Sequence, residues 1–203
     1  MSLPPTACLY LHGFLSSPAS GKAQEVLHYY REQNAEDRVC IPALPFEPVV
    51  AIAQAAEHLQ ALQQRFEQVF VIGSSLGGFY ATWLAQQHGV RAVLVNPAVR
   101  PHELFQHYIG PVKHYYTDEI HELTPAHLEQ LAAIAVTTIA QPQNLLVMLQ
   151  TGDETLDYRH AEELYRGCPR ILEQGGSHTF DGFIDHMPTI QEFAASGRLR
   201  VTS

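Results

Sequence analysis

Six short apolar segments, each of strand length, recur along this chain and are separated by longer segments with helical periodicity. They are rich in Val, Ile and Leu, and the longer ones do not alternate cleanly with polar residues: Ala7–Leu11, Arg38–Ile41, Gln68–Ile72, Ala92–Val95, Leu145–Gln150 and Arg170–Glu173. Strands that are buried on both faces have this pattern. The order predicts an α/β fold with a mostly parallel sheet of about six strands and helices on both faces.

Five segments between these runs have the features of helices: Ser20–Gln33, Val49–Phe66, Leu76–His88, Tyr158–Arg166 and Phe183–Ala195. Ser20 is expected to cap the first of them. Gly89 is expected to be the glycine that ends the third, and Pro188 to break or bend the last.

The chain has 203 residues, of which 46% are hydrophobic and 16% charged, so one domain over residues 1–203 is expected. No apolar run approaches the roughly 20 residues that a membrane span needs. The N-terminus lacks the basic region of a secretion signal, which favours a cytoplasmic protein. The net charge of −9 without a basic stripe argues against a nucleic-acid partner. Three distant cysteines argue against a disulfide framework.

One segment, Pro97–Gln141, is far longer than a single crossover helix requires. It holds five histidines and several aromatic residues, and it follows the end of a strand. We expect an insertion that forms a lid or a pocket wall; a surface excursion without a role is the alternative.

The strand that ends near Ile72 leads into Gly73-Ser74-Ser75-Leu76-Gly77, which contains the pattern Gly-x-Ser-x-Gly between a strand and a helix. This context predicts a nucleophile elbow, a sharp turn that lifts Ser75 above the sheet. The flanking glycines would remove side chains that collide with the neighbouring strand and helix. A phosphate-binding loop would need a different glycine spacing or a lysine. The pattern favours Ser75 over Ser74 as the nucleophile.

The first strand leads into His12-Gly13-Phe14. In a fold of this kind that loop lies beside the elbow, so the backbone N–H groups of Phe14 and Leu76 are expected to form an oxyanion hole. Gly13 would allow close approach of the backbone, and His12 would shape the loop. An ordinary turn is the alternative interpretation.

A base is expected late in the chain, because the order in such enzymes is Ser, acid, His. His178 lies on the glycine-rich segment after the last strand and is favoured, with His186 as the second choice. The acid should follow Leu145–Gln150. Asp153 directly follows the strand and is favoured over Glu154 and over Asp157, which is placed to cap the next helix.

Metal sites are not supported by the spacing of the histidines. His102-Glu103 and His121-Glu122 begin like His-Glu-x-x-His, but the next histidine comes five or six residues later rather than four. A second ligand at that spacing leaves the helix face of the first. We therefore expect no metal and no cofactor.

These segments together resemble the α/β-hydrolase superfamily and, within it, the small bacterial esterases of the YqiA/YcfP type. The resemblance spans nearly the whole chain and rests on Leu11-His12-Gly13-Phe14, Ser16-Ser17-Pro18 with Lys22, Gly73–Gly78, Thr151–Glu154 and Gly176-Ser177-His178. It implies a small-molecule substrate, either an acyl ester or an acyl-CoA thioester, cleaved by Ser75, Asp153 and His178. No motif identifies the residues that bind substrate, and oligomeric state is not indicated.

Two other functions stay open from the sequence. One is an α/β-hydrolase fold that acts as a non-catalytic binding module. The other is a different reaction at the same elbow: acyl transfer, amide cleavage or carbon–carbon bond hydrolysis.

Overall fold

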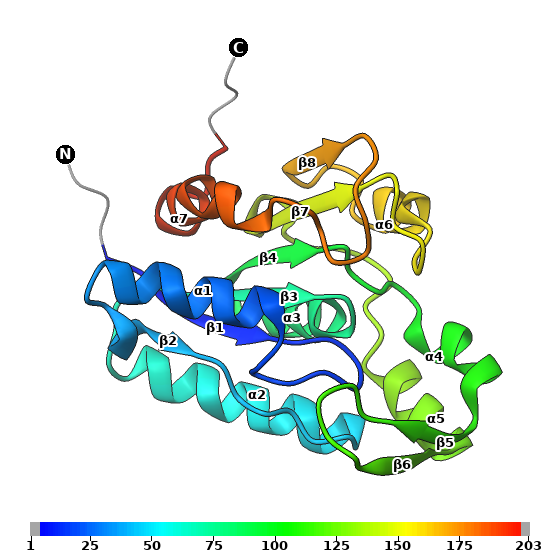
Figure 1. Cartoon of the computed structure of the whole chain (residues 1–203). Coiled ribbons are helices and arrows are strands. Elements are labelled where there is room, and N and C mark those ends of the chain that lie inside the picture. The colour runs from blue at the N-terminus through cyan, green and yellow to red at the C-terminus, as the bar shows by residue number, and fades with distance from the viewer. Residues whose placement is uncertain (1–4, 200–203) are drawn as a thin grey trace.

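The computed structural model describes residues 5–199. Its centre is a six-stranded sheet in the order β2-β1-β3-β4-β7-β8, and all of its neighbouring strands are parallel (Figure 1). The strands are β1 (Ala7–Leu11), β2 (Val39–Cys40), β3 (Val69–Ser74), β4 (Arg91–Val95), β7 (Leu145–Gln150) and β8 (Arg170–Glu173). The predicted fold class, a mostly parallel α/β sheet of six strands, is confirmed.

Helices cover both faces of this sheet. They are α1 (Gly21–Glu32), α2 (Pro48–Gln63), α3 (Leu76–His88), α4 (Pro101–Leu104), α5 (Pro125–Ala133), α6 (Tyr158–Leu164) and α7 (Met187–Ser196). Successive side chains of a strand point to opposite faces. In β1, Leu9 and Leu11 therefore join the core beneath α2 and α3, whereas Cys8 and Tyr10 join the core beneath α1 and α7.

Three predicted helices have clearly different bounds in the structure. Helix α6 stops at Leu164 rather than Arg166. Helix α2 stops at Gln63 rather than Phe66. The last predicted helix is divided into a 3-10 turn, Phe183–His186, and α7. Pro188 lies in the first turn of α7, where its missing N–H costs nothing because the first N–H groups of a helix have no intrahelical acceptor.

The helix ends also differ in how they are capped. Gly89 adopts a left-handed conformation after α3, with φ of 67°, as predicted. Ser20 occupies the N-cap position of α1, but its side chain makes no capping hydrogen bond. The prediction of a Ser20 cap is therefore right in position and wrong in the contact.

The segment 97–141 contains α4, α5 and an antiparallel hairpin of β5 (Gly110–Lys113) and β6 (Ile120–Leu123). The hairpin was not expected, because its strands carry Pro, Lys, His and Glu instead of an apolar run. Five side chains of this segment are nevertheless buried in the core that α2 and α3 share: Ala98, Phe105, Leu123, Leu128 and Leu131.

Among residues 5–199, no helix has both the length and the apolar character required to cross a bilayer.

Candidate active site

The carboxyl ends of the central strands all point toward the side where α4, α5 and the hairpin lie (Figure 1). In parallel sheets this edge is where ligand sites form, because several loops meet there. Three of those loops follow β1, β3 and β7, and a fourth follows β8; they carry every site residue that the sequence predicts.

Ser75 joins β3 to α3 in a backbone conformation that is rare for a residue with a side chain, with φ of 56° and ψ of −120°. Neighbouring backbone groups hold it there. Its N–H donates to Val95 O at 3.0 Å, and its carbonyl accepts from Gly78 N at 2.9 Å and Ala98 N at 3.0 Å. Such strain persists only where the surroundings impose it, and it is concentrated at functional sites.

The two glycines of the elbow are required by close packing. A Cβ on Gly73 would overlap the backbone of Gly77 and the side chain of Ala81 in α3. A Cβ on Gly77 would overlap the carbonyl of Leu11 at the end of β1. From the sequence we expect side chains at these positions to collide with the adjacent helix and strand. The contacts in the structure agree with that expectation.

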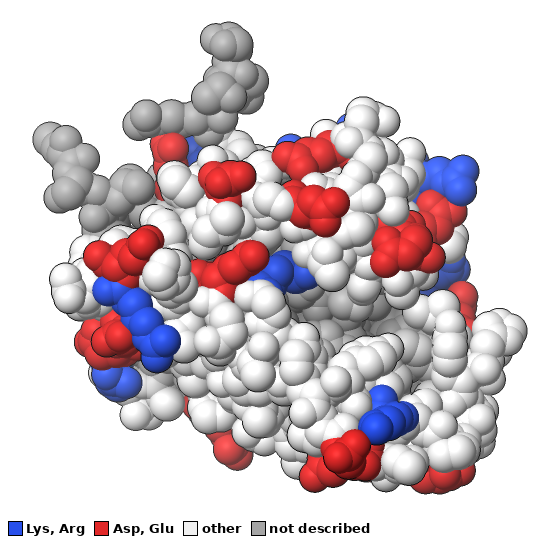
Figure 2. Space-filling view, in the orientation of Figure 1, with Lys and Arg blue, Asp and Glu red and all other residues white. Residues whose placement is uncertain are grey.

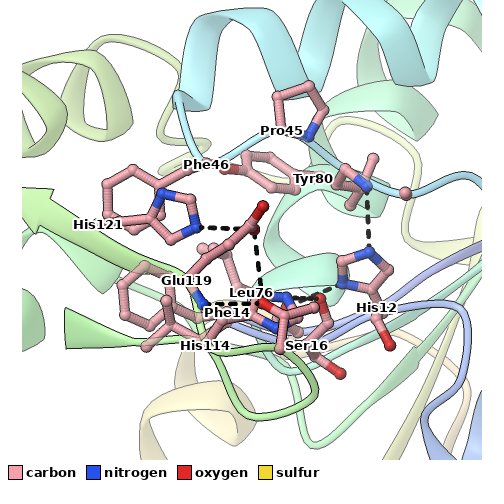
Figure 3. Close-up of a pocket in the computed structure, with 16 residues that line it drawn as sticks. His12, Phe14, Ser16, Pro45, Phe46, Leu76, Tyr80, His114, Glu119 and His121 are labelled. Carbon is pink, nitrogen blue, oxygen red and sulfur yellow. Dashed lines mark hydrogen bonds and ion pairs between the residues drawn. The ribbon is translucent and has the colours of Figure 1, made fainter.

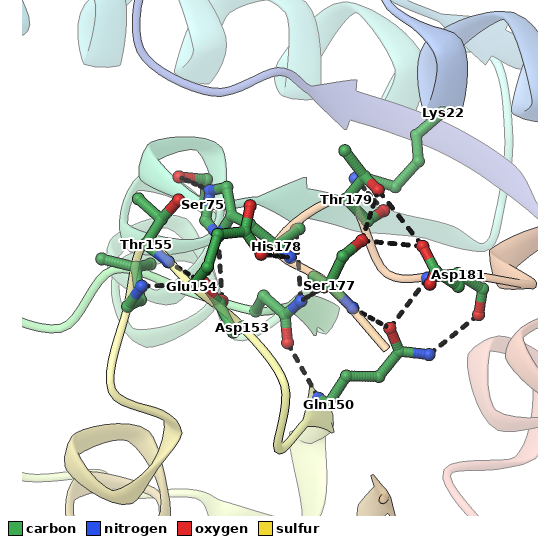
Figure 4. A network of polar contacts seen from close by, with 12 residues as sticks. Lys22, Ser75, Gln150, Asp153, Glu154, Thr155, Ser177, His178, Thr179 and Asp181 are labelled. Atoms are coloured by element: carbon green, nitrogen blue, oxygen red, sulfur yellow. Dashed lines mark hydrogen bonds and ion pairs between the residues drawn. The ribbon is translucent and has the colours of Figure 1, made fainter. Parts of the chain in front are cut away.

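The structure brings Ser75, His178 and Asp153 together. His178 Nε2 lies 3.0 Å from Ser75 Oγ, and His178 Nδ1 lies 2.8 Å from Asp153 Oδ2 (Figure 4). A carboxylate can only accept a hydrogen bond, so it selects the form of the imidazole that carries a proton on Nδ1. Nε2 is then free to accept the proton of the serine hydroxyl.

The Asp153 side chain is only 2% exposed and is fixed by its own loop. Its Oδ1 accepts from the backbone N–H groups of Thr155 at 2.9 Å and Leu156 at 2.8 Å. Of the two other carboxylates, Asp157 caps α6 by accepting from Arg159 N. Glu154 accepts from the backbone N–H of His178 at 2.9 Å, so it contacts the histidine loop rather than the imidazole.

The remaining alternatives are His186 and Ser74, and Ser74 lines the same cavity as Ser75. His186 Nε2 pairs with Glu173 at 3.0 Å, and its ring contacts Phe180. Ser74 is buried as the last residue of β3.

Two buried amides that sequence reasoning missed hold the loop that carries His178. Asn96 Nδ2 donates to the carbonyls of Ser177 and His178 at 3.0 and 3.2 Å. Gln150 Oε1 accepts from Ser177 N at 3.0 Å and Asp181 N at 2.8 Å, and its Nε2 donates to Asp181 O at 2.8 Å (Figure 4).

A signal for both amides exists in the sequence. Asn96 immediately follows the apolar run Ala92–Val95, and Gln150 ends the run Leu145–Gln150. A polar residue at the carboxyl end of a buried parallel strand faces the edge where the site forms. The two side chains are also linked, because Asn96 Oδ1 accepts from Gln150 N at 3.0 Å.

The predicted oxyanion residues lie beside Ser75. Phe14 and Leu76 line the same cavity as Ser75 and His178. A Cβ on Gly13 would lie 3.3 Å from Ser75 Cβ, so the loop after β1 approaches the elbow closely. Leu76 is the first residue of α3, and an N–H in the first turn of a helix has no intrahelical acceptor.

His12 is buried and, with Phe14, lines a second cavity of about 290 Å³ (Figure 3). Its Nε2 accepts from Leu44 N at 3.1 Å, and its Nδ1 lies 3.0 Å from Gly13 O. Burial lowers the pKa of His12. The imidazole therefore acts as a neutral connection between the loops after β1 and β2.

The cavity at Ser75 has a volume of about 900 Å³, and the segment 97–141 forms one part of its wall. The tip of the hairpin contacts the loop after β1: Tyr115 N donates to Leu15 O, and His114 Nε2 donates to Ser16 O, both at 2.9 Å. Aromatic and aliphatic side chains line this wall: Leu104, Phe105, Tyr108, Val112, Tyr115 and Tyr116.

The described residues contain no group of three or more His, Cys, Asp or Glu side chains arranged to hold a metal ion. His102 and His121 each approach one glutamate, Glu103 at 3.9 Å and Glu119 at 3.7 Å.

Comparison with known proteins agrees with this architecture. The model of the Uncharacterised protein family (UPF0227) matches residues 7–195. The UPF0227 protein YcfP of Escherichia coli O9:H4 (strain HS) is 25% identical over 134 residues, which cover 64% of this chain and 67% of that protein.

Two solved structures have the same fold at low sequence identity. Est1E from Butyrivibrio proteoclasticus has a TM-score of 0.70 at 14% identity, over 96% of this chain and 88% of its own. Alpha/beta hydrolase domain-containing protein 10 from mouse has a TM-score of 0.68 at 14% identity, over 95% and 91%. The chain therefore has the α/β-hydrolase fold.

Proposed function

This chain belongs to the uncharacterised protein family UPF0227 and is an α/β-hydrolase-fold protein of the YqiA/YcfP type, and we propose that it is a serine hydrolase. Its substrates are acyl esters or acyl thioesters of small molecules. The observation that carries this proposal is the continuous chain of contacts from Ser75 Oγ through His178 to the buried carboxylate of Asp153.

The first half of the reaction forms an acyl-enzyme. Ser75 Oγ attacks the acyl carbonyl while His178 Nε2 takes the hydroxyl proton. Asp153 keeps the imidazole oriented and stabilises its positive charge. The N–H groups of Phe14 and Leu76 stabilise the negative oxygen of the tetrahedral intermediate, each with about 3–4 kcal/mol where such donors have been removed. His178 then gives its proton to the leaving alcohol or thiol, and the acyl group stays on Ser75.

The second half releases the acid. His178 takes a proton from water, the resulting hydroxide attacks the acyl carbon, and the bond to Ser75 Oγ breaks as His178 returns the proton to that oxygen. These reaction steps need no cofactor.

Ester hydrolysis is favoured over the other reactions of this fold by the character of the cavity and by the neighbours in structure. The cavity wall is mainly apolar and aromatic. Est1E, which shares this fold, has been solved with ferulic acid bound. A lid function for residues 97–141, a single domain over residues 1–203 and a cytoplasmic location belong to the same proposal.

The test uses a fluorophosphonate, which reacts only with an activated serine, together with acyl esters and acyl-CoA thioesters of increasing chain length. We expect the wild type to be labelled at Ser75. Ser75→Ala should lose the labelling, and its kcat/KM should fall at least about 10³-fold. Ser74→Ala should keep substantial activity. A non-catalytic binding module would not be labelled. The opposite ranking of the two serine variants would refute the assignment of the nucleophile.

A further inference from the structure

The chain contains two lysines, Lys22 and Lys113, and both line the cavity next to Ser75. None of the arginines within residues 5–199 lines it, although the chain has ten arginines in all. This placement is notable in a protein with a net charge of −9. Carboxylates are spread over the face that surrounds the hollow, and blue side chains are few there (Figure 2).

Lys22 reaches from the first turn of α1 toward the loop that carries His178 (Figure 4). Its Nζ donates to the carbonyl of Thr179. Three carboxylates, those of Glu25, Asp153 and Asp181, act on its charge from nearby. Within the described part of the chain none of them forms an ion pair with Lys22, whereas Lys113 is paired with Asp118 at 3.0 Å.

Two of these acidic neighbours have other partners, and Glu25 and Asp181 line the same cavity as Lys22. Asp153 is bonded to His178, and Asp181 accepts from Ser177 Oγ at 2.7 Å. An ammonium group can donate three hydrogen bonds. Lys22 donates one of them to Thr179 O, which leaves two for a ligand. Burial lowers the pKa of Lys22 to about 8, so the group is charged at neutral pH but is poorly compensated.

The start of α1 adds to the positive potential around Lys22. Ser20 and Gly21 line the same cavity. Ser20 Oγ is inaccessible to solvent and has no hydrogen-bond partner among the described residues, and a helix N-terminus favours a nearby negative charge. The start of α1 and Lys22 thus line one cavity together with the proposed nucleophile.

We propose that the cavity takes a substrate bearing an anionic group, a carboxylate or a phosphate, which Lys22 binds while the acyl carbonyl lies at Ser75. The aromatic wall formed by Phe105, Tyr108 and Tyr116 contacts the apolar part of the same molecule. This inference rests on the proposed hydrolase function and specifies the substrate class of that site.

The experiment compares matched neutral and anionic substrates with wild type and Lys22→Met. The carboxylate arm uses mono-4-nitrophenyl adipate and its methyl ester, and the phosphate arm uses butyryl-CoA and S-butyryl pantetheine. The measured quantity is the ratio of kcat/KM for the anionic substrate to kcat/KM for the neutral one. We expect this ratio to fall at least about tenfold in Lys22→Met in one arm, which then identifies the anionic group.

Lys22 also donates to Thr179 O, so its replacement can lower turnover of every substrate by loosening the histidine loop. That effect alone would lower kcat/KM equally for both members of a pair and leave the ratio unchanged. An unchanged ratio in both arms overturns the inference. A second readout is pH: the preference for the anionic substrate should decline in wild type as the pH rises past about 8, where free Lys22 loses its charge, and no such decline should occur in Lys22→Met.

Arg31→Met is the matched control. It removes one positive charge from the same helix, at an exposed position paired with Glu36, and should leave the ratio unchanged. An equal fall in Arg31→Met would show an effect of net charge and would overturn the assignment to Lys22. If wild type cleaves none of the four compounds and Ser75 is not labelled, the hydrolase function itself is refuted, and the inference falls with it. If wild type cleaves them but the ratio of kcat/KM values is the same in Lys22→Met, only the inference is refuted.

Discussion

At the scale of single residues, Lys22 and His12 illustrate opposite ways of burying a basic group. His12 is neutral, and both of its ring nitrogens face backbone groups, so burial costs little at neutral pH. Lys22 keeps its charge at neutral pH although burial lowers its pKa to about 8. A protein carries such a cost most readily at a binding site, where the ligand supplies the missing partner.

Lys22→Met should therefore raise the free energy of unfolding. A lysine whose pKa is lower in the folded state than its unfolded value of about 10.5 destabilises the fold at every pH below the folded pKa. The destabilisation disappears as the pH rises from about 8 to about 10.5. We expect Lys22→Met to be more stable than wild type by about 2 kcal/mol at pH 7, after allowing for the lost bond to Thr179.

Urea denaturation of both proteins at pH 7 and pH 10 measures this effect. The difference in unfolding free energy between them should shrink at pH 10. A variant that is less stable than wild type at pH 7 would mean that the Thr179 contact outweighs the cost of burying the charge.

At the scale of elements, the loop between β8 and α7 is positioned by side chains from other strands. Asn96 follows β4, and Gln150 ends β7, and between them they bond the backbone of Ser177, His178 and Asp181. Gly176 lies against Gln150, and a Cβ at this position would overlap the Gln150 side chain. The imidazole is thus aligned with Ser75 through two buried amides that do not touch the reacting atoms.

Gln150→Leu tests the positioning role of this amide. The substitution leaves the N–H groups of Ser177 and Asp181 without their acceptor, which should lower the unfolding free energy by about 2–4 kcal/mol. Because the imidazole loses its fixed orientation, kcat should fall about 10- to 100-fold with a smaller change in KM. Steady-state kinetics with a neutral ester, below the melting temperature of the variant, measure the split.

Gln143→Leu, an exposed amide at the opposite end of β7, is the control and should retain wild-type kcat. If Gln150→Leu loses stability but keeps the wild-type kcat, Gln150 has a structural role only.

At the scale of the whole molecule, the segment 97–141 shares the core of the sheet. Its side chains Phe105, Leu123 and Leu131 belong to the same buried cluster as Leu59 of α2 and Leu84 of α3. The exposed hairpin tip is joined to the loop after β1 by the bonds to Leu15 and Ser16. The insertion therefore packs against the core of the sheet and is hydrogen-bonded to the proposed oxyanion loop.

We expect the insertion and the sheet to unfold together. Thermal unfolding followed by the far-UV circular dichroism of the helices and by tyrosine absorbance should coincide in one transition, as in a two-state domain. Limited proteolysis at temperatures below that transition should leave residues 97–141 uncut. Early cleavage there would instead describe a segment that opens on its own.

Much of this architecture can be predicted from the sequence, because its causes are local. Buried parallel strands need continuous apolar runs, and β1, β7 and β8 coincide with their predicted residues. The elbow is recognisable because a strand, two glycines and a helix must be adjacent in the chain for Ser75 to adopt its strained backbone. Helix α3 begins and ends where the sequence predicts for the same reason.

The remaining features depend on residues that are far apart in the chain. The hairpin of β5 and β6 lacks an apolar signature because it is largely exposed, and nothing nearby in the sequence indicates that it contacts Leu15. Asn96 and Gln150 acquire their role only when three loops meet at one edge of the sheet. The missing ion pair of Lys22 likewise depends on which carboxylates fold beside it. Short-range patterns determined the six strands of the sheet, the helices between them outside the segment 97–141, and the elbow. The partners of buried polar groups were decided by packing, since an unpaired polar group has a cost only after folding has excluded water from it.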